Sequence, residues 1–477
     1  MRQNRPKARK YGIRAIALSL CAALLLVFAG CGEQSGSVST VGSVVGSDVN
    51  TVTETYFVEK FYFHVTDDAN IVSENGLYFA NNELLVVPNA SVTRADVEAA
   101  LSADNGSIVG YSDLTNEYQI QFAQEYGLAE LQALQEKLGQ SGLYSSVRLN
   151  YGMDLTCDYY PTSDTQWAQD WSQTPQGDNW GVEAIQAPAA WDSRDTLETV
   201  NVGLIDNWCY NDHTEMNLER TYYNRNGDDS AHGTHTTCTI ADVFHNVSVI
   251  SGIMQHVNLY GFAINGTAAM TTEYICSAAL RILIERDQCK VINISMGFQR
   301  YTFAASHGNV NAQAVIDEIN AGIERLLLAL VNNGHEFVIV KSAGNDNARS
   351  DPSEDHRYTQ DPTAFIGYVQ DKNGSEYGDT DAVYDFFSGI TNPEVQSRIL
   401  VVGAAELTES GAIQMAPYSN HGDRVDLAAP GSSIESTYAN LQNDGSYQEG
   451  YALGSGTSMA APHVAGVAAM LFGASPT

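Results

Sequence analysis

Four polar side chains occupy positions at which a folded enzyme can place its chemistry. Asp206 follows the apolar run 200–205, Asn345 follows a second such run, and His232 and Ser458 each open a segment that favours a helix. The amino end of a helix carries partial positive charge, so Ser458 lies in a field that favours developing negative charge. Asn345 is either a turn former or a donor of its side-chain amide to an oxyanion. These residue types suit chemistry in which an anion forms and is stabilised.

A parallel β-sheet would bring these side chains to one edge. Continuous apolar runs predict buried strands at 200–205, 291–294, 337–340 and 399–402, and such runs are typical of a parallel sheet covered on both faces. Functional groups collect just past the carboxyl ends of these strands. Those ends carry Asp206, Ser295-Met296-Gly297 and Ser342-Ala343-Gly344-Asn345. The helix that opens near Ser458 is rich in alanine and glycine, so we expect it to pack tightly in the interior.

A smaller unit precedes this sheet. Its pattern predicts the order strand, helix, strand, strand, helix, strand, over 84–87, 93–101, 108–111, 118–122, 128–138 and 147–151. Thr93 and Asp96 are spaced as a helix capping pair. This order suits a ferredoxin-like α+β sandwich, in which two helices cover one antiparallel sheet. No residue pattern in this unit indicates catalysis.

The charge balance excludes one class of partner. The 477 residues contain 24 Lys and Arg against 57 Asp and Glu, a net charge of −33. A protein that neutralises nucleic-acid phosphates needs a basic surface, so we expect no nucleic-acid partner. Hydrophobic residues make up 44% of the chain, which is enough for a sizeable core.

The first thirty residues have the composition of an export signal. Six basic residues precede an uncharged, Leu- and Ala-rich run, which is typical of a secretory signal peptide. The segment Val27-Phe28-Ala29-Gly30-Cys31 resembles the bacterial lipobox, in which the cysteine is acylated and becomes the mature N-terminus. We therefore expect an exported lipoprotein, held at a membrane through Cys31 and facing the extracellular or periplasmic side. An uncleaved anchor and soluble secretion are the alternatives.

The spacing of cysteines and histidines argues against a zinc site. Five cysteines follow residue 31, an odd number, so at least one thiol is unpaired unless a bridge forms to another molecule. Their spacing does not form a CxxC zinc pattern, and no third ligand accompanies His232 and His235 at local spacing. We expect no cofactor for the chemistry itself.

Several motifs together resemble one enzyme family. Gly456-Thr457-Ser458-Met459-Ala460-Ala461-Pro462-His463-Val464-Ala465-Gly466 resembles the serine motif of subtilisin-like peptidases, and His232-Gly233-Thr234-His235 resembles their histidine motif. The order Asp, His, Ser is also that of the family. Further matches lie at 180–191, 291–297, 342–345 and 418–431, and together they span about 300 residues. The front unit similarly resembles the propeptide of these enzymes, which serves as folding template and inhibitor.

The resemblance implies roles for individual residues. Ser458 would be the nucleophile, His232 the general base and then acid, and Asp206 the carboxylate that orients the imidazole. Asn345 and the Ser458 backbone N–H would hold the oxyanion. Two segments, Ser295-Met296-Gly297 and Ala343-Gly344, would pair with the substrate backbone and wall the pocket for the residue before the cut. Structural calcium is also implied, at a site that the sequence does not assign; Asn246 falls in a candidate loop.

These observations predict five segments and one activity. The segments are a signal peptide (1–30), a Ser/Gly-rich tether with a short extension (31–75), a propeptide-like domain (76–153), a linker with the processing site (154–179) and a subtilase catalytic domain (180–477). We expect a serine endopeptidase that acts on protein or peptide substrates, made as a zymogen whose propeptide inhibits it. An inactive subtilase-fold lipoprotein that binds peptides or acts as a scaffold is the alternative. Asn207-Trp208, after Asp206, depart from the small residue and glycine usual in the family.

Overall fold

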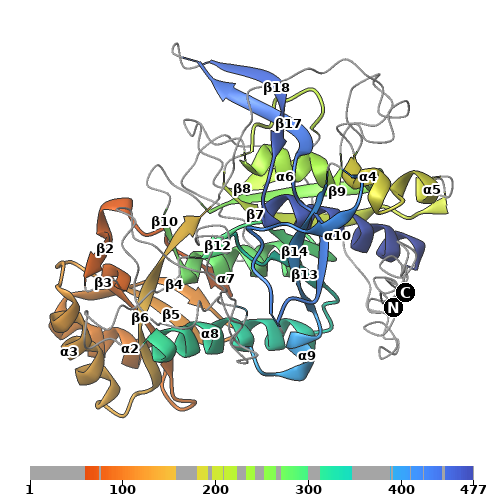
Figure 1. Cartoon of the computed structure of the whole chain (residues 1–477). Coiled ribbons are helices and arrows are strands. Elements are labelled where there is room, and N and C mark those ends of the chain that lie inside the picture. Colours follow the sequence, from red (N-terminus) through yellow and green to blue (C-terminus); the bar gives the residue numbers. More distant parts are fainter. Residues whose placement is uncertain are drawn as a thin grey trace, which may run out of the picture.

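The computed structural model describes most of the chain beyond residue 59. The described residues are 60–74, 77–156, 180–191, 196–207, 209–216, 218–222, 232–241, 252–264, 270–298, 312–345, 387, 390–408, 410–422, 424–442 and 446–475. The signal peptide, Cys31, Trp208, Asn246 and most of the linker lie outside them. A front domain and a larger α/β domain lie side by side (Figure 1).

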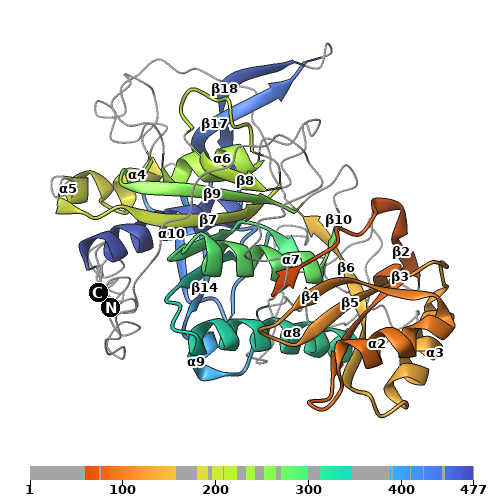
Figure 2. The same cartoon turned by 180° about the vertical axis from the view of Figure 1, so that it is seen from behind.

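The front domain contains the six predicted elements in the predicted order. They are β3 (Leu77–Pro88), α2 (Arg94–Leu101), β4 (Gly106–Ser112), β5 (Glu117–Phe122), α3 (Leu128–Gly139) and β6 (Tyr144–Thr156). The strands are antiparallel in the order β4-β5-β3-β6. Thr93 and Asp96 form the expected capping box of α2. Both helices lie on the face of the sheet turned away from the large domain (Figure 2).

The predicted boundaries of this domain are wrong at both ends. Residues of the short extension, predicted to follow the tether within 31–75, form β1 (Phe61–Tyr62) and β2 (Ile71–Glu74), which pair with β4 and β3. The backbone hydrogen bonds of these short strands incorporate them into the sheet. At the other end β6 continues to Thr156, past the predicted start of the linker, because its last residues find partners in the large domain.

The large domain is built on a twisted, mainly parallel sheet. Six strands lie parallel in the order β14-β13-β11-β7-β9-β8, and β16 pairs with β14. The antiparallel β15 extends the edge at β14. The strand bounds are β7 Val200–Asp206, β8 Leu218–Tyr222, β9 Val257–Ala263, β11 Val291–Ile294, β13 Val338–Ser342, β14 Ile399–Leu407, β15 Ile413–Met415 and β16 Leu427–Pro430. All four predicted strands occur, and the prediction of a parallel sheet is confirmed.

Helices cover both faces of this sheet. Helices α6 (His232–Ile240) and α10 (Thr457–Ala474) pack on one face, and α7 (Glu273–Arg281) and α8 (Ala312–Asn332) on the other. Short helices α4 (Trp180–Ala184), α5 (Ala187–Trp191) and α9 (Pro393–Gln396) flank the sheet, and β17 (Ile434–Leu441) and β18 (Tyr447–Gly454) form a hairpin. Helix α10 is long and apolar enough to span a membrane, but 78% of it is buried inside the protein. It is a core helix.

Small side chains allow α10 to lie inside the fold. A Cβ atom on Gly466 would lie 2.7 Å from Cβ of Ile253, which is closer than side-chain atoms normally approach. Ala460, Ala461, Ala465 and Ala469 are each fully buried. The alanine-rich sequence therefore brings the amino end of α10, with Ser458, next to the carboxyl ends of the parallel strands.

Charged side chains, most of them buried, join the front domain to α7 and α8. Arg148 of β6 lies 2.9 Å from Glu117 and also pairs with Glu273 of α7. Arg325 of α8 lies 3.1 Å from the same Glu117. Arg281 of α7 donates to the Ser112 hydroxyl and the Asp113 carboxylate of the front domain. Because buried charges are stable only when paired, these contacts fix how the two domains dock.

The last residues of β6 reach into the large domain. Strand β10 (Met270–Thr272) pairs with Gly152, Met153 and Asp154, and β12 (Gly297–Phe298) pairs with Leu155 and Thr156. Both pairings are antiparallel. The front domain thus delivers an extended strand to the edge formed by residues just past β11.

Candidate active site

A carboxylate and an imidazole form the centre of the site. Asp206 ends β7, and His232 opens α6. The Nδ1 atom of His232 lies 2.7 Å from Oδ1 of Asp206, and both side chains are at most 1% exposed. A buried carboxylate at this distance fixes the orientation of the ring and stabilises its protonated form.

Two further groups hold the carboxylate in place. The backbone N–H of Asn207 donates to Oδ1 of Asp206 at 2.8 Å, and the Thr236 hydroxyl donates to Oδ2 at 2.9 Å. Thr236 stands one helical turn after His232, so α6 positions both the imidazole and a donor to its carboxylate. Both oxygens of Asp206 are therefore occupied, and the carboxylate has little freedom to rotate.

The unusual residue after Asp206 caps the histidine helix. Oδ1 of Asn207 accepts a hydrogen bond of 2.9 Å from the backbone N–H of Gly233. The first N–H groups of a helix have no partner within the helix, and an asparagine side chain is well suited to supply one. Asn207 thus connects the end of β7 to the start of α6, which explains part of the departure from the family pattern.

Replacing Asn207 by Ala is expected to destabilise the fold by about 1 kcal/mol, because the buried Gly233 N–H loses its acceptor. Urea unfolding monitored by tryptophan fluorescence would measure the change. Asn211→Ala is the matched control, since Asn211 donates only to the Thr221 hydroxyl in an exposed hydrogen bond. Equal losses in the two variants would contradict a capping role for Asn207.

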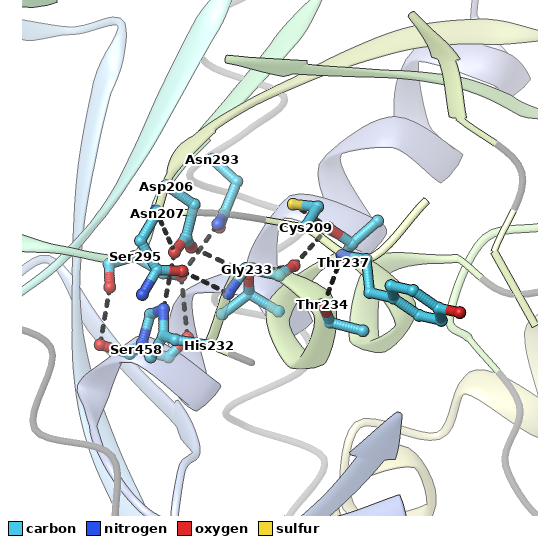
Figure 3. Close-up of polar contacts among 12 residues, drawn as sticks. Asp206, Asn207, Cys209, His232, Gly233, Thr234, Thr237, Asn293, Ser295 and Ser458 are labelled. Carbon is cyan, nitrogen blue, oxygen red and sulfur yellow. Dashed lines mark hydrogen bonds and ion pairs between the residues drawn. The ribbon is translucent and has the colours of Figure 1, made fainter. Parts of the chain in front are cut away.

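Ser458 lies in the first turn of α10 and forms a reciprocal pair with Ser295. The Ser458 hydroxyl donates to the Ser295 carbonyl at 2.7 Å, and the Ser295 hydroxyl donates to the Ser458 carbonyl at 2.8 Å. Figure 3 shows Ser458, His232 and Asp206 in one close-up with these contacts. A hydroxyl has one hydrogen, so in this state it is not directed at the imidazole. The hydroxyl must turn away from the Ser295 carbonyl before it can donate to His232.

Asn345 is held by the residue that precedes Ser458. Its Oδ1 accepts from the backbone N–H of Thr457 at 2.7 Å and from the Thr457 hydroxyl at 2.9 Å. The NH₂ group of the amide is therefore turned away from Thr457 and is left as a donor. Gly344, at φ 94°, adopts a backbone conformation that favours glycine and turns the chain between β13 and Asn345.

The predicted substrate-binding residues divide into two groups. Gly297 already pairs with an extended strand, through Thr156 of β6. Ser295 and Met296 have fully buried side chains, so only their backbone is placed to contact another chain. This edge of the site accepts an antiparallel strand.

Backbone pairing by Ala343 and Gly344 was predicted, and it is wrong. The N–H of Ala343 donates to the Val402 carbonyl, and the N–H of Gly344 donates to the Thr457 hydroxyl. Their carbonyl groups accept from Asn420. These groups serve the neighbouring strand and α10, so the segment can wall a pocket but cannot extend a sheet.

Metal ligation finds no support among the described residues. No group of three or more His, Cys, Asp and Glu side chains gathers there. His235 instead lies within hydrogen-bond distance of the carbonyl oxygens of Ile434 and Ala452. We assign no calcium site. In the same part of the chain Cys209, Cys238, Cys276 and Cys289 are buried thiols, and burial raises the pKa of Cys209 to about 12.

Sequence reasoning missed several supports of this site. The hydrogen bonds of Asn207, Thr236 and Thr457 were not predicted. Thr236 could have been predicted, because it lies four residues after His232 and therefore on the same face of a helix. The contacts of Asn207 and Thr457 depend on how β7, α6 and α10 pack together. Local sequence patterns do not predict this packing. Together the site offers a hydroxyl, a base with its carboxylate, and donors for an anion, which is the set required for nucleophilic attack on a carbonyl group.

Comparison with known proteins agrees with this chemistry. The model of the subtilase family (Peptidase S8) matches residues 160–477. Subtilisin E of Bacillus subtilis (strain 168) is 25% identical over 306 residues, 62% of this chain and 62% of that protein. Subtilisin of Bacillus pumilus is 26% identical over 306 residues, 62% of this chain and 86% of that protein. The chain thus spans less than two thirds of the length of subtilisin E.

A solved structure shares the fold. Fervidolysin from Fervidobacterium pennivorans, described as a keratinolytic enzyme related to subtilisin, superposes with a TM-score of 0.56 at 20% sequence identity. The superposition covers 85% of this chain and 56% of that one. At this identity the likeness establishes the fold alone.

Proposed function

The chain belongs to the subtilase family, and on this premise we propose that it is a serine endopeptidase, made as a zymogen and tethered to a membrane. The observation that carries the proposal is the buried Asp206–His232 pair, 2.7 Å apart, beside Ser458 at the amino end of α10. Its substrates are protein chains, cut at internal peptide bonds.

Acylation uses the three residues in sequence. The Ser458 hydroxyl turns to His232, and its oxygen bonds to the substrate carbonyl carbon while its proton moves to Nε2. Asp206 stabilises the imidazolium that forms. The tetrahedral intermediate then collapses: the carbon–nitrogen bond breaks, Nε2 gives its proton to the leaving amine, and an ester on Ser458 remains.

Deacylation repeats the steps with water. His232 takes a proton from water as the oxygen bonds to the ester carbon, and the bond to Ser458 breaks as the serine oxygen regains a proton. In both halves the carbonyl oxygen becomes an anion. The Asn345 amide and the Ser458 N–H, at the positive end of α10, supply donors to it.

The pairing of the last residues of β6 with the large domain supports the zymogen proposal. Its last residues pair on one side with β10 and on the other with β12. A strand held in this way covers the edge to which a substrate chain would add. The buried ion pairs of Arg148 and Arg281 with groups across the domain boundary supply further affinity for the front domain.

The tether rests on the sequence alone. The basic stretch, the apolar run and the lipobox-like segment before Cys31 support export and acylation. A lipid on Cys31 would hold the enzyme at the outer side of a membrane, where its substrates are other exported proteins.

Intact mass of the wild type and of Ser458→Ala, after equal incubation, tests the proposal. Only the wild type is expected to lose the front domain, because cleavage requires the serine oxygen. A fluorophosphonate that reacts with activated serines is expected to label Ser458 in the wild type alone. Cleavage in both proteins would indicate a contaminating protease. Absence of both cleavage and label would instead favour an inactive peptide-binding protein.

A further inference from the structure

A proline interrupts the hydrogen bonding of α10 at the nucleophile. In an α-helix each carbonyl oxygen accepts from the backbone N–H four residues later, so the Ser458 carbonyl would accept from residue 462. That residue is Pro462, which is buried inside α10 and has no N–H to donate. The sequence therefore deprives the Ser458 carbonyl of its helical donor. Because Ser458 is itself buried, this carbonyl needs a partner from another element.

The side chain of Ser295 supplies that partner. Its Oγ donates to the Ser458 carbonyl at 2.8 Å. Ser295 lies just past β11 and is fully buried, and its Oγ accepts from Nδ2 of Asn293, also at 2.8 Å. Since the amide donates to this oxygen, the single hydroxyl hydrogen of Ser295 is available to Ser458. Figure 3 shows the three residues together with these contacts. A chain of two hydrogen bonds thus joins the central strand β11 to the nucleophile.

The two hydrogen bonds between Ser295 and Ser458 differ in what the reaction does to them. The bond from the Ser458 hydroxyl to the Ser295 carbonyl breaks when the hydroxyl turns to His232. The bond from the Ser295 hydroxyl involves only the backbone of Ser458, so it is kept. On the other side of the nucleophile, Asn345 holds the backbone N–H of Thr457. The main chain is therefore held on both sides of Ser458 while its side chain moves.

We propose that Ser295 is a positioning residue for the nucleophile, an inference that rests on the proposed endopeptidase function. Its hydroxyl replaces the helical N–H that Pro462 lacks and keeps the Ser458 backbone in the geometry of attack. The serine oxygen and the Ser458 N–H must both meet the reacting carbonyl group, and small displacements of such groups are costly in rate. This role of the side chain is separate from the substrate pairing predicted for the Ser295 backbone.

Reaction with a fluorophosphonate measures this role. The serine oxygen bonds to phosphorus, the phosphorus–fluorine bond breaks, and the serine proton passes to His232. Each protein is the full chain, incubated until its intact mass is constant, and labelling is followed at several reagent concentrations. We expect Ser295→Ala to lower the saturating rate about tenfold and to leave the half-saturating concentration unchanged.

Ser436→Ala is the matched control for loss of a buried hydroxyl. Ser436 is also fully buried, and its hydroxyl has no hydrogen-bond partner within the described part of the chain. It lies in β17, outside the groups assigned to catalysis. We expect this variant to keep the wild-type labelling rate.

A double-mutant cycle connects the effect to the proline. Pro462→Ala returns an N–H to the position four residues after Ser458, so the carbonyl regains a helical donor. In that background Ser295→Ala is expected to cost about twofold or less. Ser295→Cys keeps the size of the side chain with a weaker donor and should lose about threefold. Urea midpoints of the same variants, combined with Ser458→Ala to prevent self-digestion, record changes in stability separately.

The outcomes separate this inference from the proposed function. An equal cost of Ser295→Ala with and without Pro462 would overturn the inference, since the hydroxyl would not be replacing the missing N–H. An unchanged saturating rate would also overturn it: a lower urea midpoint would then make Ser295 a structural residue, and a higher half-saturating concentration would make it a binding residue. If Ser295→Ala does not fold, a wild-type rate in Ser295→Cys has the same meaning. All these results leave the peptidase in place, whereas an unlabelled wild-type Ser458 would overturn the peptidase and this inference with it.

Discussion

Replacing Asp206 by Asn is expected to lower kcat/KM for a peptide substrate by about 10⁴-fold, as in other serine peptidases with this triad. Asp206 accepts hydrogen bonds from His232 Nδ1, from the Asn207 backbone and from Thr236. An amide has one acceptor oxygen instead of two and carries no charge. It therefore cannot stabilise the imidazolium, and its NH₂ group favours the ring tautomer that is unable to accept the serine proton.

A graded series distinguishes this effect from misfolding. Thr236→Val removes one donor to Asp206 and preserves the shape of the side chain, so we expect a loss of only about tenfold. Ser458→Ala should lose about as much activity as Asp206→Asn, or more, because the residues of a triad act as a unit. Equal urea midpoints for the three proteins would attribute the losses to chemistry. Full activity in Asp206→Asn would contradict the assigned role of the carboxylate.

The strands and their ends could be predicted because the signal is local. Buried parallel strands are continuous apolar runs, and the polar residue that ends a run marks the functional edge. Asp206 and Asn345 were found in this way. The front domain was likewise predictable, since each helix and strand carries its own period. Its first two strands were missed because β1 has only two residues, and the four residues of β2, Ile71-Val72-Ser73-Glu74, neither alternate nor form a continuous apolar run.

Other features of the site depend on contacts between distant segments. The reciprocal pair of Ser295 and Ser458 joins residues 163 positions apart. The predicted pairing of Ala343 and Gly344 with substrate failed because their backbone groups are used by β14, Asn420 and Thr457. Such contacts are properties of the assembled core.

Two buried histidines beside the triad are expected to make the fold unstable in acid. Burial lowers the pKa of His235 to about 3, with a smaller contribution from the charge of the nearby His232. Burial also lowers the pKa of His463 to about 4. In the unfolded chain both have a pKa of about 6.5. Between these values the unfolded state binds protons that the folded state does not, so the free energy of unfolding decreases as pH falls.

The magnitude follows from the same pKa values. Each histidine contributes up to about 1.4 kcal/mol per pH unit, so the two together should remove about 4 kcal/mol between pH 7 and pH 5. Urea unfolding of Ser458→Ala at these pH values would measure the loss without self-digestion. Adding His463→Asn keeps a donor near the Met459 carbonyl, which lies 2.8 Å from Nδ1, and removes one titrating group.

The difference between the two proteins isolates one histidine from every other titrating group. The pH-dependent loss in Ser458→Ala/His463→Asn should be smaller by about 2 kcal/mol over the same interval, because only His463 has been removed. Parallel pH curves would mean that His463 is protonated in the folded state at pH 5, against the burial that lowers its pKa. A smaller pH-dependent loss in Ser458→Ala/His463→Asn would place part of the acid sensitivity in the packing of α10, the helix that carries both His463 and Ser458.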